Sequence, residues 1–179
     1  KLAGELGVAT TTIYWHVGGR DELLVAVIER LSEDLAARPV TGDTSQDRVL
    51  AVARLAWDSA FEHRNVTALA HQIGATSLLG LPIEVALAQE LEAAGLRGPA
   101  ARDALRAILM CVAGFLVVAL RRDDGIAPDH RSEALWAEVP AQVSAETRAA
   151  LCEPADVAAL FESTLRAVVG QPFPIRVSA

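Results

Sequence analysis

Helical periodicity runs along almost the whole chain, and it limits the possible folds more than any other feature. Apolar residues recur at spacings of three and four over 21–38 and again from Ser45 to about Arg64, which places them on one face of a helix. Further helices are predicted over 66–76, 83–94, 100–122 and 155–169. No segment shows the strict alternation of a β-strand. The sequence therefore predicts an all-α fold.

The best domain boundary follows the helix predicted over 21–38. Arg38 precedes Pro39, and a residue before proline is disfavoured in helical conformation. The short polar segment 40–44 comes next, so we expect a small N-terminal unit over 1–38 and a larger helical unit over 39–179. Residues 123–140 are predicted to form a long loop with a short turn around Trp136.

The segment 107–120 is apolar on every side of its predicted helix. Its longest apolar run, 108–120, has thirteen residues, whereas a bilayer requires roughly 20. We therefore expect a buried helix and no membrane span. Because one amphipathic layer cannot cover all its faces, a second copy of the chain is the expected cover. A helix buried wholly inside the monomer is the alternative.

Composition narrows the class of protein. With 52% hydrophobic and 22% charged residues, the chain is too apolar to remain disordered. Its two cysteines, Cys111 and Cys152, form neither a disulfide framework nor a CxxC pair, which favours a reducing cytoplasm. No HExxH, GxSxG, phosphate-binding or dinucleotide-binding motif occurs. We expect no catalytic residue, cofactor or metal site.

The most informative stretch is 1–24, KLAGELGVATTTIYWHVGGRDELL, which has the pattern of a helix-turn-helix. Such a motif needs small residues where its helices cross, a glycine at the turn and branched residues that anchor the second helix. Ala3, Gly7, Val8 and Ile13 fill these positions. The second helix, from about Thr10 to His16, would then present hydroxyl groups and aromatic side chains to a DNA major groove.

At these residues the chain resembles the tetracycline-repressor (TetR) family of bacterial regulators. The matches are Leu2, Ala3, Leu6, Gly7, Val8, Thr12, Ile13, Tyr14, His16, Val17, Arg20, Asp21, Leu23 and Leu24. The segment 14–17, YWHV, is similar to the branch that contains the tetracycline repressor. The resemblance implies that Thr10, Thr11, Thr12, Tyr14 and His16 contact DNA, with Trp15 at the sugar-phosphate backbone and Arg20 at a phosphate. Ala9 departs from the usual capping serine or threonine, and Thr10 is the expected substitute.

Charge is distributed unevenly for a DNA-binding protein. The formal net charge is −7, yet residues 1–20 carry +1, from Lys1 and Arg20 against Glu5. The resemblance implies a further DNA-binding helix before Lys1, and we expect that helix to be basic, because phosphate contacts provide most non-specific affinity.

For the larger unit, the resemblance implies a homodimer formed through the helices at 100–122 and 155–169. A twofold dimer reads a palindromic operator. A small molecule bound in the larger unit would swing the helix 21–38 and release the DNA, so a repressor is expected. Helices 45–64, 83–94 and 100–122 should surround its cavity. The predicted lining residues are Val52, Trp57, Phe61, Leu87, Leu91, Leu105, Ile108 and Val112.

The expected effector is apolar. The positions closest to the histidine, asparagine and glutamine that hold magnesium-chelated drug in the tetracycline repressor are Ser77, Val52 and Leu87. None supplies the same group, which argues against a metal-chelated inducer. His71 is a possible polar anchor, or an ordinary core or surface histidine. The alternative function is a helical small-molecule-binding protein without DNA binding.

Overall fold

The computed structural model describes residues 2–120, 131–139 and 143–170. The N-terminal helices are α1 (Leu2–Leu6), α2 (Thr10–Val17) and α3 (Arg20–Ala36). The central helices are α4 (Ser45–Glu62), α5 (Arg64–Gln72), α6 (Thr76–Ala93) and α7 (Gly98–Leu120). The last three are α8 (Ser132–Ala137), α9 (Ala145–Leu151) and α10 (Val157–Gly170). No strand occurs in the described residues, so the predicted all-α fold is confirmed.

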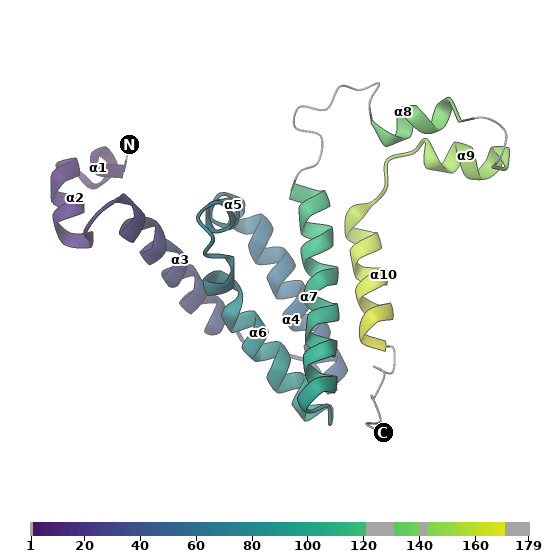
Figure 1. Ribbon diagram of the computed structural model, residues 1–179, viewed down its shortest axis with the longest axis horizontal. Helices are drawn as coiled ribbons and strands as arrows, with labels where there is room; N and C mark the ends of the chain where they lie inside the picture. The colour runs from purple at the N-terminus through teal and green to yellow at the C-terminus, as the bar shows by residue number, and fades with distance from the viewer. Residues whose placement is uncertain (1, 121–130, 140–142, 171–179) are drawn as a thin grey trace.

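The helices form three groups in space (Figure 1). Helices α1 and α2 lie at the far end of α3, away from the rest of the chain, and α4 to α7 form the body together with α10. Helices α8 and α9 lie beyond one end of α7 and α10. The predicted division after residue 38 falls in the connection between α3 and α4.

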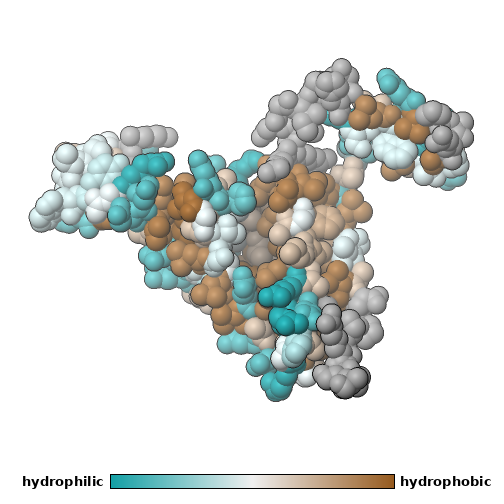
Figure 2. All heavy atoms as spheres, viewed as in Figure 1, coloured by the Kyte–Doolittle hydropathy of each residue, from teal (hydrophilic) through white to brown (hydrophobic). Residues whose placement is uncertain are grey.

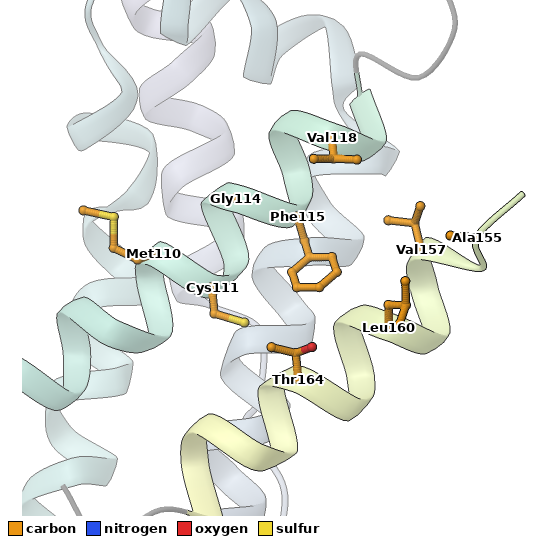
Figure 3. Close-up of a pocket in the computed structure, with 9 residues that line it drawn as sticks. All are labelled: Met110, Cys111, Gly114, Phe115, Val118, Ala155, Val157, Leu160 and Thr164. Atoms are coloured by element: carbon orange, nitrogen blue, oxygen red, sulfur yellow. The ribbon is translucent and has the colours of Figure 1, made fainter. Parts of the chain in front are cut away.

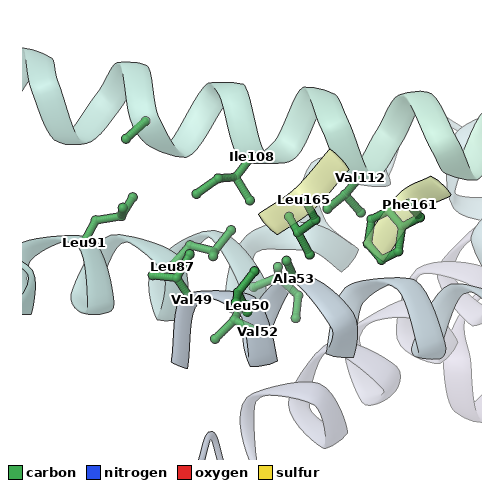
Figure 4. Close-up of a cluster of buried hydrophobic side chains, with 12 residues drawn as sticks. Val49, Leu50, Val52, Ala53, Leu87, Leu91, Ile108, Val112, Phe161 and Leu165 are labelled. Atoms are coloured by element: carbon green, nitrogen blue, oxygen red, sulfur yellow. The ribbon is translucent and has the colours of Figure 1, made fainter. Parts of the chain in front are cut away.

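The core lies where α4, α6, α7 and α10 meet (Figure 4). Its buried residues are Val49, Leu50, Val52, Ala53, Ile83, Leu87, Leu91, Ala104, Ile108, Val112, Phe161 and Leu165. Helix α3 packs on α6 and buries Ile28, Leu31 and Leu35. The N-terminal helices are thus joined to the body through a helix that is itself packed against it.

The start of α4 shows how local sequence sets a boundary. The Thr44 hydroxyl accepts a hydrogen bond from the Asp47 N–H at 3.1 Å, and the Thr44 N–H donates to the Asp47 carboxylate at 3.1 Å. This reciprocal capping box satisfies N–H groups that have no partner within the helix. The helix predicted from Ser45 is confirmed.

Helix α6 begins at Thr76, so the start predicted at residue 83 was wrong. Pro82 lies inside the helix and has no N–H to donate to the carbonyl of Leu78. The Ser32 hydroxyl of α3 donates to that carbonyl instead, at 3.1 Å. A tertiary hydrogen bond therefore satisfies the carbonyl that the proline leaves without its helical donor.

The stretch between α7 and α10 also differs from the prediction. Within the segment 123–140, predicted as a loop, α8 forms a helix around Trp136, while residues 123–130 and 140 lie outside the described residues. Helix α9 was not predicted, and its N-terminus is capped by the Ser144 hydroxyl, which accepts from the Thr147 N–H at 3.2 Å. Both helices are short, so their periodicity is weak.

Helix α7 has 23 residues and is long and apolar enough to cross a membrane by length and composition alone. It nevertheless packs against α4, α6 and α10, and buries Ala104, Ile108 and Val112 in the core. The core helix of a soluble protein has the same length and composition, so this feature is weak evidence for a span.

Candidate nucleic-acid interface and ligand cavity

The turn between α1 and α2 has the geometry that a helix-turn-helix requires. Gly7 has φ +65°, a conformation that side chains with a Cβ rarely adopt. The Val8 N–H donates to the Ala3 carbonyl at 3.0 Å and closes the end of α1. Helix α2 is followed by Gly18, which has φ +95° and whose N–H donates to the Tyr14 carbonyl at 2.8 Å. The two glycines thus set both ends of a short, separate helix.

Every residue predicted to contact DNA is exposed. They are Thr10, Thr11, Thr12, Tyr14, Trp15, His16 and Arg20. Trp15 is 83% exposed and makes an edge contact with the His16 ring at a centroid distance of 5.3 Å. Helix α2 buries none of its residues. The structure therefore brings six of the seven onto one exposed helix and places Arg20 at the start of the next, while their contact with DNA remains a prediction.

The beginning of α2 lacks a side-chain cap. Ala9 occupies the capping position, and no side chain accepts a hydrogen bond from the first N–H groups there, so Thr10 does not replace the missing acceptor. Arg20 lies 3.6 Å from the Asp21 carboxylate, and both side chains are solvated. Such an exposed pair is weak, so the guanidinium stays available for another anion.

A cavity of about 270 Å³ lies in the body between α3, α4, α5, α6 and α7. Its lining residues are Leu35, Ala56, Ser59, Ala60, Thr67, Thr76, Ser77, Leu79, Gly80, Ile83, Glu84, Leu109, Val112, Ala113 and Leu116. Leu35, Ile83 and Val112 are buried and form an apolar floor, whereas Thr76 and Ser77 are exposed at the rim. The cavity is therefore an apolar pocket with a polar opening.

Two polar side chains distinguish this cavity from ordinary core. Ser59 is only 4% exposed, and its hydroxyl makes no hydrogen bond with the described residues. Glu84 is the one charged residue among those that line the cavity, and no described cation pairs with it. Buried polar groups in proteins normally have partners, so a ligand could supply them here.

Of the predicted ligand residues, Val112 lines the cavity. Val52, Leu87, Leu91 and Ile108 are buried inside the core cluster, and Leu105 and Trp57 pack against it. Phe61 is 38% exposed and lies beside Trp57, with the two ring centroids 4.8 Å apart. In this structure these seven side chains therefore fill and flank the core next to the cavity, and their contact with a ligand remains a prediction.

The cavity residues that were not predicted from the sequence include polar side chains. Ser59, Thr67 and Glu84 line the cavity, and Glu84 had a signal in the sequence as the single acid within an apolar stretch beside Gly80 and Pro82. Ser77, which the resemblance had matched to a drug-binding position, lies at the rim. By contrast, His71 is exposed and does not line the cavity.

The cavity is connected directly to the helix that carries α2. Leu35 of α3 forms part of its wall, and Ser32, one turn earlier, donates to the Leu78 carbonyl of α6. Leu79 and Gly80, which follow Leu78, also line the cavity. A displacement of α6 by a bound molecule would therefore act on α3 through both contacts.

A second hollow lies on the outside of the body, between α7 and α10 (Figure 3). This groove, of about 350 Å³, is lined by Met110, Cys111, Gly114, Phe115, Val118, Ala155, Val157, Leu160 and Thr164. Met110 is 76% exposed, Val118 60% and Leu160 48%. Hydrophobic surface also gathers over α7 in the space-filling view (Figure 2). Large apolar side chains left exposed together mark an interaction surface.

Helix α10 forms the far wall of this groove, and aromatic contacts and an ion pair hold it against α4 and α7. The Phe161 ring stacks on Trp57 of α4 at 4.3 Å and meets Phe115 of α7 at 5.7 Å. The Arg54 guanidinium of α4 pairs with the Glu162 carboxylate, with Nε–Oε2 at 2.9 Å, and lowers the pKa of that carboxyl. Burial raises the pKa of the Cys111 thiol in the groove, so this cysteine is a neutral, apolar wall residue.

No group of three or more His, Cys, Asp or Glu side chains in the described part of the chain could hold a metal ion. No family model and no curated protein matches the chain. A solved structure is similar over most of its length: the TetR family protein ActR of Streptomyces coelicolor, in complex with actinorhodin. The TM-score is 0.66 at 21% identity, over 94% of this chain and 83% of ActR. The chain therefore has the all-helical fold of a TetR family protein.

Proposed function

We propose that this chain is a ligand-responsive, DNA-binding transcriptional regulator: a cytoplasmic homodimeric repressor that a small molecule releases from a palindromic operator. One observation carries the proposal. The cavity wall includes α3, the helix that bears the exposed α2 at its other end. ActR, similar in fold, is a TetR family protein seen with a bound small molecule, which supports the same kind of response here.

In this proposal, α2 enters the major groove and its threonines and aromatic residues contact bases and phosphates. The groove between α7 and α10 is covered by the same groove of a second copy, because a twofold interface is formed by one surface on both subunits. Dimerisation then places two α2 helices on one face of the DNA. A ligand that binds better to the non-binding arrangement shifts the population toward it and lowers operator affinity.

A mobility-shift titration of the full chain with DNA from upstream of its own coding sequence tests the proposal. We expect a shifted band that needs a palindrome and weakens steeply as salt rises, because neutralised phosphates release counterions. Tyr14→Ala should weaken binding about tenfold and leave the dimer intact, whereas Val85→Ala, a change at an exposed position of α6, should leave binding unchanged. Absence of any shift at low salt would exclude the regulator.

The alternative, a ligand-binding helical protein without DNA binding, is favoured by one feature. Helix α2 contains no lysine or arginine, and residues 1–20 carry a net charge of only +1. The same titration distinguishes the two functions, because the alternative predicts no palindrome-dependent band. Turnover of a bound small molecule would instead indicate an enzyme.

A further inference from the structure

The inner cavity described above combines small size with a single charge. Its volume of about 270 Å³ lies just below the range of about 300–1,000 Å³ that is usual for small-molecule sites. Its floor is formed by aliphatic side chains, including Ile83, Leu109 and Val112. A compact and largely apolar molecule would fill it with little loss of polar hydration.

Glu84 gives the cavity its electrostatic character. All the other side chains that line it are neutral. Helix α6 contains no lysine or arginine that could neutralise this carboxylate from a neighbouring turn. Glu90, further along the same helix, shows the contrasting case, because its carboxylate receives a 2.7 Å hydrogen bond from Arg48. Glu84 is thus a partly buried acid that has no protein cation among the described residues.

The position of the carboxylate places it at the cavity wall. A Cβ built on Gly80, itself a lining residue, would lie 3.8 Å from Glu84 Oε1. The carboxylate therefore lies over a part of α6 that has no side chain. In a partly dry pocket, attraction between this charge and a cation is much stronger than in water, and an anion is repelled to the same degree.

The Ser59 hydroxyl adds a second, independent recognition group. It is more than nine-tenths buried, lines the cavity and has no hydrogen-bond partner in the described residues. A hydroxyl both donates and accepts, so it can bind a ring nitrogen or oxygen of a ligand. A molecule with no polar atom would leave this group unsatisfied.

We propose that the cavity binds a compact, largely apolar organic cation, such as a protonated aromatic amine, whose N–H groups face Glu84 and whose body contacts the apolar floor and Ser59. The inference rests on the proposed function only in treating this cavity as the effector site. Its chemistry follows from the lining residues.

Three tricyclic probes of similar size test the charge preference: 9-aminoacridine, which is cationic at neutral pH, neutral 9-anthracenemethanol and anionic 9-anthracenecarboxylate. Each is titrated into the full chain and followed by its own fluorescence. We expect 9-aminoacridine to bind at least tenfold more tightly than the anion, with the neutral probe between them. Equal or tighter binding of the anion, or no binding of 9-aminoacridine, would overturn the proposal.

Three variants test whether Glu84 causes the preference for the cationic probe. Glu84→Gln keeps the shape of the side chain and should reduce the cation-to-anion preference to within about threefold. Glu29→Gln removes an equal charge from an exposed position of α3 and should leave the preference unchanged. Ala113→Phe fills the exposed rim and should weaken all three probes together. A preference that survives Glu84→Gln would overturn the assignment.

The two proposals fail separately. The mobility-shift titration contains no probe, so loss of cation selectivity leaves the DNA result standing. Conversely, a chain that selects 9-aminoacridine through Glu84 but shifts no DNA would be a cation-binding helical protein.

Discussion

The two hollows of the body share one helix and differ in chemistry. Leu109, Val112, Ala113 and Leu116 of α7 face the inner cavity, while Met110, Cys111, Gly114, Phe115 and Val118 face the outer groove. Each set follows the spacing of one helical face. The cavity contains a carboxylate and hydroxyl groups, whereas the groove is almost entirely hydrocarbon. A compact, largely apolar cation suits the first hollow, and a matching apolar protein surface suits the second.

The largest expected effect is on dimerisation through the groove between α7 and α10. Leu160→Glu should weaken dimerisation by more than a hundredfold, or about 3 kcal/mol, because it removes a leucine that the proposed interface would bury and places a charge in an apolar contact. Val85→Glu is the matched control: Leu160 is 48% and Val85 47% exposed, and Val85 lies outside the groove. Sedimentation equilibrium measures both. Equal effects, or no dimer in the unmodified chain, would exclude the groove as the dimer interface.

The next effect concerns the link between the cavity and α3. Ser32→Ala should lower the free energy of unfolding by about 1–3 kcal/mol, because the Leu78 carbonyl loses the donor that replaces the N–H missing at Pro82. Ser163→Ala is the control, since Ser163 donates at 3.0 Å to the Leu160 carbonyl, which Thr164 can still serve through its backbone. Urea denaturation measures both changes.

A second substitution, at Pro82, tests whether the Ser32 hydrogen bond replaces the missing helical one. Pro82→Ala restores an N–H four residues after Leu78, so Ser32→Ala should cost clearly less in that background. An unchanged cost would mean that the hydrogen bond does not replace the helical one.

Substitution of one glycine in each hollow allows the cavity and the groove to be compared directly. Gly80 lines the cavity and Gly114 the groove, and a Cβ at either would meet no atom closer than 3.8 Å. Each change to alanine should raise the free energy of unfolding by about 0.5–1 kcal/mol, because alanine favours helix. Gly80→Ala should also weaken 9-aminoacridine binding and leave dimerisation unchanged, whereas Gly114→Ala should also change dimerisation and leave 9-aminoacridine binding unchanged. Crossed effects would show that the hollows are not independent.

The smallest expected effect is a dependence on pH at the groove wall. Arg54 lowers the pKa of Glu162, so the pair stabilises the folded state above the ordinary glutamate pKa and loses this contribution as pH falls through the lowered value. Both side chains are about one-third exposed, which limits the effect to about 0.2–1 kcal/mol. Glu162→Gln should flatten that acid limb in urea titrations. Glu29→Gln, at an exposed position with no ion pair among the described residues, should leave the acid limb unchanged.

Much of the fold was predictable because its signals are local. The helical spacing of α3, α4, α7 and α10 placed their boundaries within a few residues, and Gly7 marked the turn before α2. The exposed side chains of α2 were predicted from the helix-turn-helix pattern, which is also local. The structure confirms their exposure, because this eight-residue helix buries none of its residues. The start of α6 was not predictable, because the hydroxyl that replaces the N–H missing at Pro82 comes from Ser32, 46 residues away.

The residues that line the cavity were harder to predict, because they depend on how separate helices pack together. Val112 and Ile108 of α7 were both predicted to line the cavity, yet Val112 lines it while Ile108 is closed inside the core. One helical turn separates them, and their surroundings depend on how α4, α6 and α10 approach. Ser59 and Thr67 gave no local signal at all, because a hydroxyl becomes a binding group only when other helices bury it.

The sequence by itself determined the all-helical composition, the helix-turn-helix pattern and an α7 too apolar for one layer to cover, because these depend on backbone preference and periodicity. Tertiary structure alone decided which face of α7 closes the core, which lines the inner cavity and which remains an open groove. It also decided that Glu84 has no cation partner in the described chain while Glu90 has Arg48. Such distinctions depend on contacts between segments far apart in the chain, where local spacing has no influence.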